Sequence, residues 1–186
     1  TYADSRYDPF WAAAVDNEMP VNLHILTGVS GDSFSGNELD LFTECMPLHH
    51  PIQITLTSML TSGVFERHPN LTVVSVENDI GWIAHFLFRL DHFFDALRYT
   101  ARYSDPLRPT DYFRRNVLAT FQDDPVGVAT RDFVGANRLM WASDYPHGDS
   151  TWPYSRDVIE RNFQGVDEKT VRMITHDTVS KLYSLQ

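Results

Sequence analysis

The stretch RLMWASDYPH, residues 138–147, decides the fold of this chain. Its apolar part, residues 139–142, predicts a buried strand, and Pro146 prevents that strand from continuing. Asp144 therefore stands at the carboxyl tip of a buried strand, and the loop that follows carries His147. In parallel α/β folds, this end of the sheet is where binding and catalytic side chains lie. Asp144 is thus a candidate catalytic residue, although an aspartate here can also cap a turn.

Two further predicted strands carry polar side chains near their ends. Residues 21–26 contain His24, and residues 71–77 end in Glu77, with Asp79 close behind. A single histidine on an apolar strand is usually part of the core. Three convergent histidine and carboxylate tips are harder to explain by packing, because burying a charge without a partner is costly. Imidazole and carboxylate ligands together suit a divalent transition metal such as zinc or manganese.

Helices and strands alternate along the whole chain. The predicted strands are residues 21–26, 71–77, 117–122 and 139–143. Predicted helices begin at Pro9, Pro51, Gly81, Asp124, Ser155 and Asp167; Asp8, Asp124, Ser155 and Asp167 are the capping residues, and Val126 and Phe133 face inward. This order predicts a parallel α/β fold with right-handed crossovers, and residues 1–186 form one structural unit.

Several short motifs, each modest alone, form an ordered set. They are YDPFW (7–11), LH (23–24), GVFERHPNL (63–71), ENDIGW (77–82) and WASDYPH (141–147). In order and spacing the set resembles the amidohydrolase-related family, in the branch that includes aminocarboxymuconate-semialdehyde and resorcylate decarboxylases. The resemblance implies a metal-dependent (β/α)8 barrel, with His24 matching the mid-barrel metal ligand and Asp144 the final-strand aspartate. Zinc is the expected metal, with manganese as the alternative.

The chain also departs from the family pattern. No His-x-His or Glu-x-His motif of the kind that the family carries on its first strand precedes the strand predicted at residues 21–26. A full barrel takes roughly 250 residues, so 186 residues with four strands predict the second half of a (β/α)8 TIM-type barrel, without its N-terminal strands.

Glu77 stands where the decarboxylases carry a histidine, and it could be a base, a metal-adjacent carboxylate or a substrate contact. This difference favours a metal-dependent hydrolase that acts on a small carboxylate, amide or lactone-like substrate through metal-activated water. The alternatives are a non-oxidative decarboxylase of the same superfamily, or a catalytically incomplete fragment that acts as an oligomerisation or binding module.

Long loops supply the remaining candidate residues. Residues 27–50 and 99–115 exceed the usual connection length, so they are candidate lids or substrate contacts. His50, at a predicted helix start, and His147 and Trp152, after Asp144, are predicted to contact substrate. Cys45 is predicted to be an ordinary loop residue, because its surroundings show no nucleophile motif.

Composition excludes several partners. The net charge of −10 without a basic stripe argues against nucleic acid, and no apolar run is long enough to span a bilayer. A single cysteine fits the cytoplasm. Residues 81–97 are apolar beyond one helix face, which predicts a homo-oligomer contact. The expected partners are therefore a small-molecule substrate and a second copy of the chain.

Overall fold

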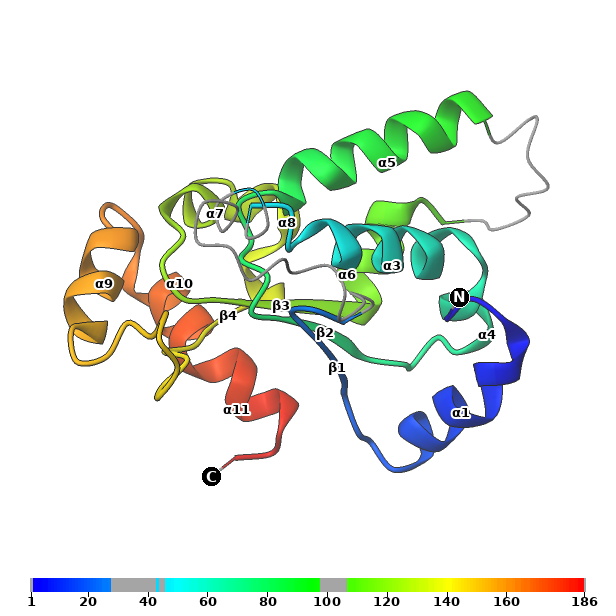
Figure 1. The fold of residues 1–186 in the computed structure, drawn as a ribbon, viewed down its shortest axis with the longest axis horizontal. Helices are drawn as coiled ribbons and strands as arrows, with labels where there is room; N and C mark the ends of the chain where they lie inside the picture. Colours follow the sequence, from blue (N-terminus) through cyan, green and yellow to red (C-terminus); the bar gives the residue numbers. More distant parts are fainter. Residues whose placement is uncertain (1, 28–42, 44–45, 98–106, 186) are drawn as a thin grey trace.

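A four-stranded parallel sheet forms the centre of the fold (Figure 1). The computed structural model describes residues 2–27, 43, 46–97 and 107–185. In spatial order the strands are β1 (Val21–His24), β2 (Val73–Val76), β3 (Val117–Phe121) and β4 (Leu139–Trp141). Val21 pairs with Val73, Ser75 with Ala119, and Phe121 with Trp141. The four predicted strands and their parallel arrangement are confirmed, each strand being shorter than predicted.

Helices precede, connect and follow the four strands. Before β2 they are η1 (Ser5–Tyr7), α1 (Asp8–Asp16), α3 (His50–Thr61) and α4 (Val64–Arg67). Between β2 and β4 they are α5 (Ile83–Leu97), α6 (Pro109–Asn116), α7 (Pro125–Ala129), α8 (Arg131–Val134) and η3 (Ala136–Arg138). After β4 come α9 (Ser155–Asn162), α10 (Glu168–Arg172), the π-helical turn η4 (Met173–Asp177) and α11 (Thr178–Leu182).

Both faces of the sheet are apolar, as expected for parallel strands. Val73, Val117 and Leu139 belong to the main core, together with buried side chains of α3, α5 and α6. The alternate positions form a second cluster, of Val74, Leu118 and Met140, against which Val179 and Leu182 of α11 pack. Figure 1 accordingly shows α3, α5 and α6 on one side of the sheet and α11 on the other.

Two predictions, for the loop 99–115 and for the cap of α1, were wrong. The predicted loop 99–115 contains the start of α6, whose first turn holds Pro109 and in which the Asp111 carboxylate accepts a hydrogen bond from the Arg108 N–H. Asp8 does not cap α1, because its carboxylate accepts hydrogen bonds from Arg67 instead. Long-range pairing therefore displaced the local capping interaction.

Helix starts later in the chain were predicted with mixed success. Asp124 and Asp167 cap their helices as predicted, by accepting hydrogen bonds from backbone N–H groups. Ser155 does not cap α9, since its hydroxyl pairs with Thr151 instead. The predicted helix from Asp124 to Gly135 is divided into α7 and α8. Val126 and Phe133 are consequently exposed rather than inward-facing.

Some predictions lie outside the described residues. They include the greater part of the loop 27–50, with Cys45, and residues 99–106 of the second loop. Among the helices that the structure describes, none has the length and apolar character needed to cross a membrane.

Candidate metal centre

Parallel strands bring the candidate residues to one end of the sheet. His24 is the last residue of β1, Glu77 follows β2 directly, and Asp144 lies just beyond β4. His147 follows in the same loop as Asp144. The carboxyl ends of parallel strands share an edge, so the sequence predicts that these side chains lie close together.

The four side chains form a continuous chain of contacts. His24 Nε2 lies 2.7 Å from Glu77 Oε2. His147 Nδ1 lies 3.9 Å from Glu77 Oε1 and 3.2 Å from Asp144 Oδ2. The carboxylates are the less exposed members, with side chains 16 % exposed for Glu77 and 20 % for Asp144. Glu77 therefore lies between the two histidines, in a position that the sequence left open.

The hydrogen bond at Nδ1 fixes how the ring of His24 can act. Nδ1 lies 3.0 Å from the carbonyl oxygen of Ile25, and because a carbonyl only accepts, Nδ1 must carry the proton. In the neutral ring, Nε2 then has a free lone pair. Such a backbone contact at one ring nitrogen is the usual support for a histidine that binds a metal through the other.

An unpaired buried oxygen is the clearest sign that the cluster fits a cation. Asp144 Oδ2 is buried and has no hydrogen-bond partner in the described part of the chain, because His147 Nδ1, though near, lies outside hydrogen-bond geometry. Leaving a carboxylate oxygen unsatisfied in this way is costly. Ligand atoms of Glu77, Asp144 and His147 lie within 4.8 Å of one another. Two carboxylates and an imidazole form a donor set that suits divalent zinc or manganese.

The backbone is strained at both carboxylates. Glu77 has φ 60° and Asp144 has φ 58°, in the left-handed region that non-glycine residues rarely adopt. Such positions cost roughly 1–3 kcal/mol and cluster at functional sites. The Thr120 hydroxyl accepts a hydrogen bond from the Glu77 N–H at 3.0 Å, which ties the strained residue to β3. These turns aim both carboxylates at the cluster.

Burial also affects Asp79, two residues beyond Glu77. Desolvation, together with the nearby carboxylates of Asp124 and Asp149, raises the pKa of Asp79 to about 6. The sequence places Asp79 close to Glu77 at the end of the same predicted strand. In the described structure, Asp79 is not among the residues that gather around His24 and Asp144.

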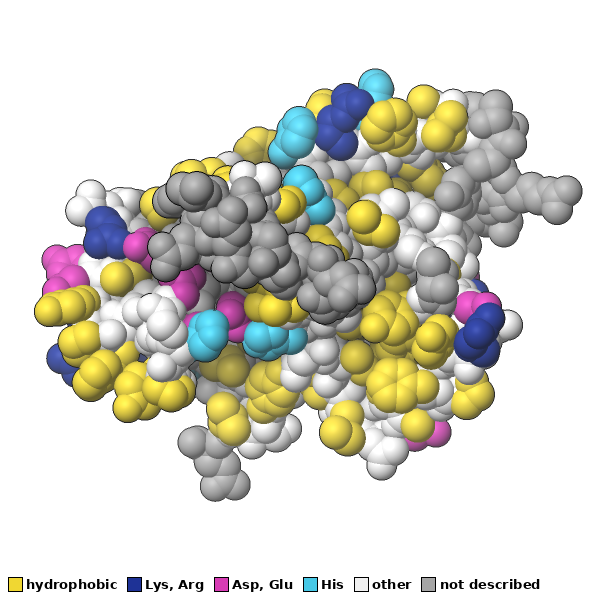
Figure 2. Space-filling model, in the orientation of Figure 1, with side chains coloured by type: hydrophobic (Ala, Val, Ile, Leu, Met, Phe, Trp, Pro, Cys, Tyr) yellow, Lys and Arg dark blue, Asp and Glu magenta, His cyan; other side chains and the backbone are white. Residues whose placement is uncertain are grey.

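A cleft of about 510 Å³ opens over the cluster. It is lined by His24, Ile25, Leu26, Leu48, Glu77, Asp144, Tyr145, Pro146 and His147. Figure 2 shows histidine and acidic side chains adjoining one another on this face, with apolar side chains beside them. The cleft therefore combines a polar floor with apolar and aromatic walls, as small-molecule sites do.

Two predicted substrate contacts lie outside the lining of this cleft. Trp152 is 60 % exposed and meets Tyr145 edge to face, with ring centroids 5.1 Å apart, so it reaches the rim through Tyr145. His50 begins α3, is exposed, and is not among the described residues that line the cleft. His147, by contrast, lines it directly. The substrate roles of all three remain predictions.

Parallel strands that alternate with helices, with carboxylates and histidines at the carboxyl edge of the sheet, are the arrangement of the α/β-barrel class. The family model described as Amidohydrolase matches residues 2–185, and the chain belongs to the amidohydrolase family.

Named relatives agree with this placement. A gamma-resorcylate decarboxylase of Rhodococcus jostii (strain RHA1) is 26 % identical over 146 residues, which cover 76 % of this chain and 44 % of the relative. The chain thus spans about half the length of the curated relatives it matches.

Solved structures share the fold. An amidohydrolase from Mycobacterium avium subsp. paratuberculosis K-10 is 26 % identical with a TM-score of 0.76, and the match covers 100 % of this chain and 47 % of that one. A dihydroxybenzoic acid decarboxylase from Polaromonas sp. JS666, with bound manganese and the inhibitor 2-nitroresorcinol, is 18 % identical with a TM-score of 0.77, covering 99 % and 55 %. The predicted part of a TIM-type barrel is confirmed.

Proposed function

We propose that this chain supplies one half of a metal-dependent, non-oxidative decarboxylase that acts on small aromatic carboxylates. The observation that carries the proposal is the buried Asp144 Oδ2, which makes no hydrogen bond and lies with ligand atoms of His147 and Glu77 at the carboxyl edge of the sheet. Hydrolysis was the reaction favoured by the sequence. The named relatives are decarboxylases, which supports the alternative drawn from the same sequence.

The residues present fit a divalent cation. Glu77, Asp144 and His147 would hold it, and His24 would support Glu77 through the 2.7 Å contact between Nε2 and Oε2. Manganese is the metal we propose, because the donor set is rich in carboxylate oxygen and the Polaromonas relative binds manganese. A bound cation acts as a Lewis acid that polarises the substrate's carboxylate or a neighbouring hydroxyl.

The protein's own groups manage one proton. Non-oxidative decarboxylation breaks the bond between ring carbon and carboxylate, releases carbon dioxide and places a proton on the ring carbon. Asp144, which lines the cleft beside His147 and Glu77, is the group we assign to deliver that proton to the ring carbon.

The rim provides the recognition of an aromatic ring. Tyr145 lines the cleft, and Trp152 packs on its outer side. Aromatic side chains favour offset or edge-to-face contact with another ring. We assign the cleft wall at Tyr145 and Pro146 to the substrate ring, which leaves its carboxylate directed toward the acidic and histidine side chains below.

The decisive experiment measures manganese retained per chain by elemental analysis after desalting. We expect about one manganese ion per native chain. In Asp144→Asn, we expect the manganese retained per chain to fall at least tenfold. Asp149→Asn is the matched control, since this exposed aspartate in the same loop lies outside the cluster. No retained metal in the folded chain, or equal loss in both variants, contradicts the proposal.

The reaction is then assayed with 2,6-dihydroxybenzoate and manganese, by carbon dioxide release. A panel of lactones and amides tests the hydrolase alternative. Turnover of 2,6-dihydroxybenzoate alone supports decarboxylation. Turnover of lactones or amides alone contradicts it and supports the hydrolase alternative.

A further inference from the structure

A buried asparagine contacts both β1 and β2 beside the candidate metal centre. Asn78 is the second residue after β2 and is 4 % exposed. Its Nδ2 donates a hydrogen bond to the Val76 carbonyl oxygen at 2.8 Å. Longer contacts join the same Nδ2 to the Ser75 hydroxyl oxygen, at 3.3 Å, and to the Leu23 carbonyl oxygen, at 3.5 Å. The side chain therefore has acceptors on both strands.

These contacts define the orientation of the Asn78 amide. Two of its three neighbours are carbonyl oxygens, which only accept, so the amide nitrogen must face them. The amide oxygen Oδ1 is then left buried, without a hydrogen-bond partner in the described part of the chain. A buried polar atom that lacks a partner costs free energy, so the side chain needs a role other than filling space.

The Val76 carbonyl oxygen is a junction between the ends of the two strands. It also accepts a hydrogen bond from the Ile25 N–H at 2.9 Å. The carbonyl oxygen of Ile25 in turn lies 3.0 Å from Nδ1 of His24 and fixes that ring. Asn78 is therefore linked to His24 through two backbone groups. It is linked to Glu77 by the peptide bond that carries the shared carbonyl.

The turn that contains Asn78 is strained on both sides. Glu77 has φ 60° and Asp79 has φ 52°, so left-handed residues flank the asparagine. Such a backbone persists only where the surrounding contacts hold it. The Asn78 side chain supplies contacts toward β1 and β2, and its carbonyl oxygen accepts a hydrogen bond from Trp82 Nε1 at 2.7 Å. Without the side chain the turn can relax, and the Glu77 carboxylate moves with it.

We propose that Asn78 is a positioning residue of the candidate metal centre. Its amide holds the Glu77 carboxylate and the His24 imidazole in the arrangement that brings them within 2.7 Å of each other. Asn78 itself is not among the described residues that line the cleft or group as metal ligands, so it acts through its neighbours. This role rests on the proposed function, which assigns metal binding to Glu77 and its support to His24.

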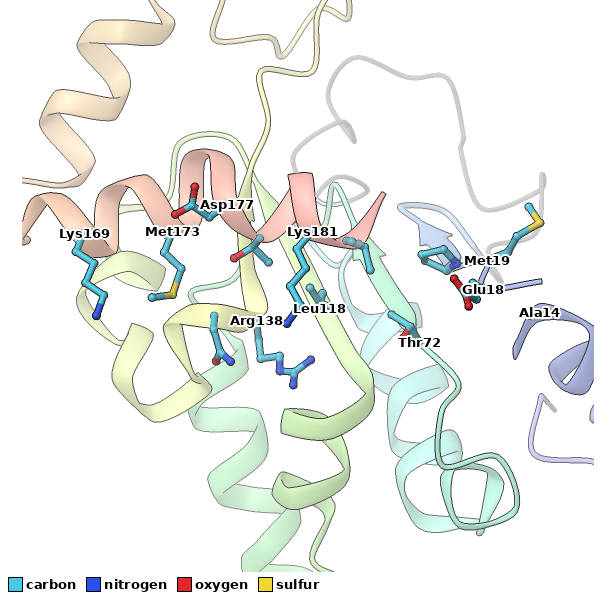
Figure 3. A pocket seen from close by; sticks show the side chains of 14 residues that line it. Ala14, Glu18, Met19, Thr72, Leu118, Arg138, Lys169, Met173, Asp177 and Lys181 are labelled. Carbon is cyan, nitrogen blue, oxygen red and sulfur yellow. The ribbon is translucent and has the colours of Figure 1, made fainter. Parts of the chain in front are cut away.

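Asn116 offers a matched control at the opposite end of the sheet. It is 1 % exposed, and its Nδ2 donates hydrogen bonds to the carbonyl oxygens of Pro69, at 2.9 Å, and Leu71, at 2.7 Å. Leu71 precedes Thr72, which lines a second cavity, of about 570 Å³, at the amino ends of the strands (Figure 3). Asn116 thus resembles Asn78 in burial and in its bonds to backbone carbonyls, but it lies away from the candidate metal centre.

Manganese titration of Asn78→Ala and Asn116→Ala at pH 8 tests the proposal, with circular dichroism and urea unfolding to verify the fold. Both substitutions should destabilise the chain, because each removes buried hydrogen bonds. Asn78→Ala should weaken manganese binding at least tenfold, whereas Asn116→Ala should leave the affinity within twofold of native. Asn78→Asp, which keeps the side-chain shape and removes the donor, replaces Asn78→Ala if the alanine variant does not fold. Equal manganese affinities in the folded Asn78 and Asn116 variants would overturn the proposal.

A measurement without metal separates the positioning role from the proposed function. In the chain treated with chelator, the Cε1–H resonance of His24 reports the surroundings of the ring, and its loss in His24→Gln assigns it. This resonance should move in the Asn78 variant and stay in place in Asn116→Ala. A native chain that binds no manganese contradicts the proposed function. An unmoved His24 resonance in the Asn78 variant contradicts the positioning role, whether or not the native chain binds manganese.

Discussion

Asp124 joins two elements near the candidate metal centre, and its removal is the sharpest stability test. It is only 8 % exposed. Its Oδ1 accepts a hydrogen bond from the Gly127 N–H at 2.7 Å, which caps α7. Its Oδ2 accepts hydrogen bonds from the N–H groups of Ile80, at 2.8 Å, and Gly81. One carboxylate thus secures both a helix start and the turn that follows Glu77.

Asp124→Ala is expected to cost about 3–4 kcal/mol. Hydrogen bonds to charged groups contribute about 1.5–3 kcal/mol each, and loss of an N-cap costs about 0.5–2 kcal/mol. The total stays below the sum, because water can enter the space left and solvate part of the freed N–H groups. In a chain of this size each kcal/mol shifts Tm by about 2–4 °C, so Tm should fall by about 10 °C.

Urea unfolding followed by tryptophan fluorescence and circular dichroism measures this loss. Asp132→Ala is the control, because this carboxylate is 82 % exposed and its one ion pair, with Arg131, is 3.9 Å long; it should cost less than about 1 kcal/mol. A loss below about 1 kcal/mol in Asp124→Ala would refute the reasoning. Manganese retention should weaken in Asp124→Ala as well, since the turn after Glu77 loses its anchor.

Three further outcomes are expected. Gly127→Ala should cost about 1–3 kcal/mol by overpacking, because a Cβ there would lie 2.2 Å from Ile80 Cγ1, measured by urea unfolding. The hydrogen bonds from Arg67 hold the pKa of Asp8 below its usual 3.8. The Asp8–Arg67 pair therefore stabilises the fold fully above pH 3.8, and this stabilisation is lost as the pH falls through the lower pKa of the folded state. Thermal melts of the native chain and of Asp8→Asn should differ at pH 6 and converge in strong acid. Phe88, 65 % exposed on α5, is predicted to lie in a homo-oligomer contact, so Phe88→Ser should dissociate the native assembly in analytical ultracentrifugation.

Each of these has a control and a contrary result. Gly148→Ala should be neutral, since nothing lies within 4 Å of the added Cβ; similar losses in both alanine variants count against the packing argument. Asp16→Asn should leave the acid dependence as in the native chain, and a difference from Asp8→Asn that persists unchanged to low pH contradicts the pairing. Phe10→Ser replaces an exposed phenylalanine on α1, and a native chain that sediments as a monomer removes the oligomer prediction.

The elements of the fold were largely readable from the sequence, because apolar runs and capping residues are local signals. The failures have two causes. Asp8 looks like an N-cap, but Arg67, distant in sequence, offers its carboxylate a charged partner. Only tertiary structure decides between a local hydrogen bond and a remote ion pair. The start of α6 was missed for another reason: Pro109 followed by Asp111 is a valid start signal inside a segment interpreted as loop.

The candidate site was predicted in its residues but not in its connections. Alternation placed His24, Glu77 and Asp144 at strand ends. The 2.7 Å contact of His24 with Glu77, and the left-handed backbone of Glu77 and Asp144, depend on φ values and strand packing that no residue pattern encodes.

Strand order explains why a site exists at all. His24 ends β1 and Glu77 directly follows β2, and these neighbouring parallel strands, about 4.8 Å apart, place the two side chains 2.7 Å from each other. Asp144 and His147 come from the loop beyond β4, and His147 Nδ1 lies 3.9 Å from Glu77 Oε1. The Thr120 hydroxyl on β3, the strand between β2 and β4, accepts a hydrogen bond from the Glu77 N–H at the same edge. The geometry of the candidate centre is therefore a property of the sheet as a whole, and single strand-end motifs do not create it.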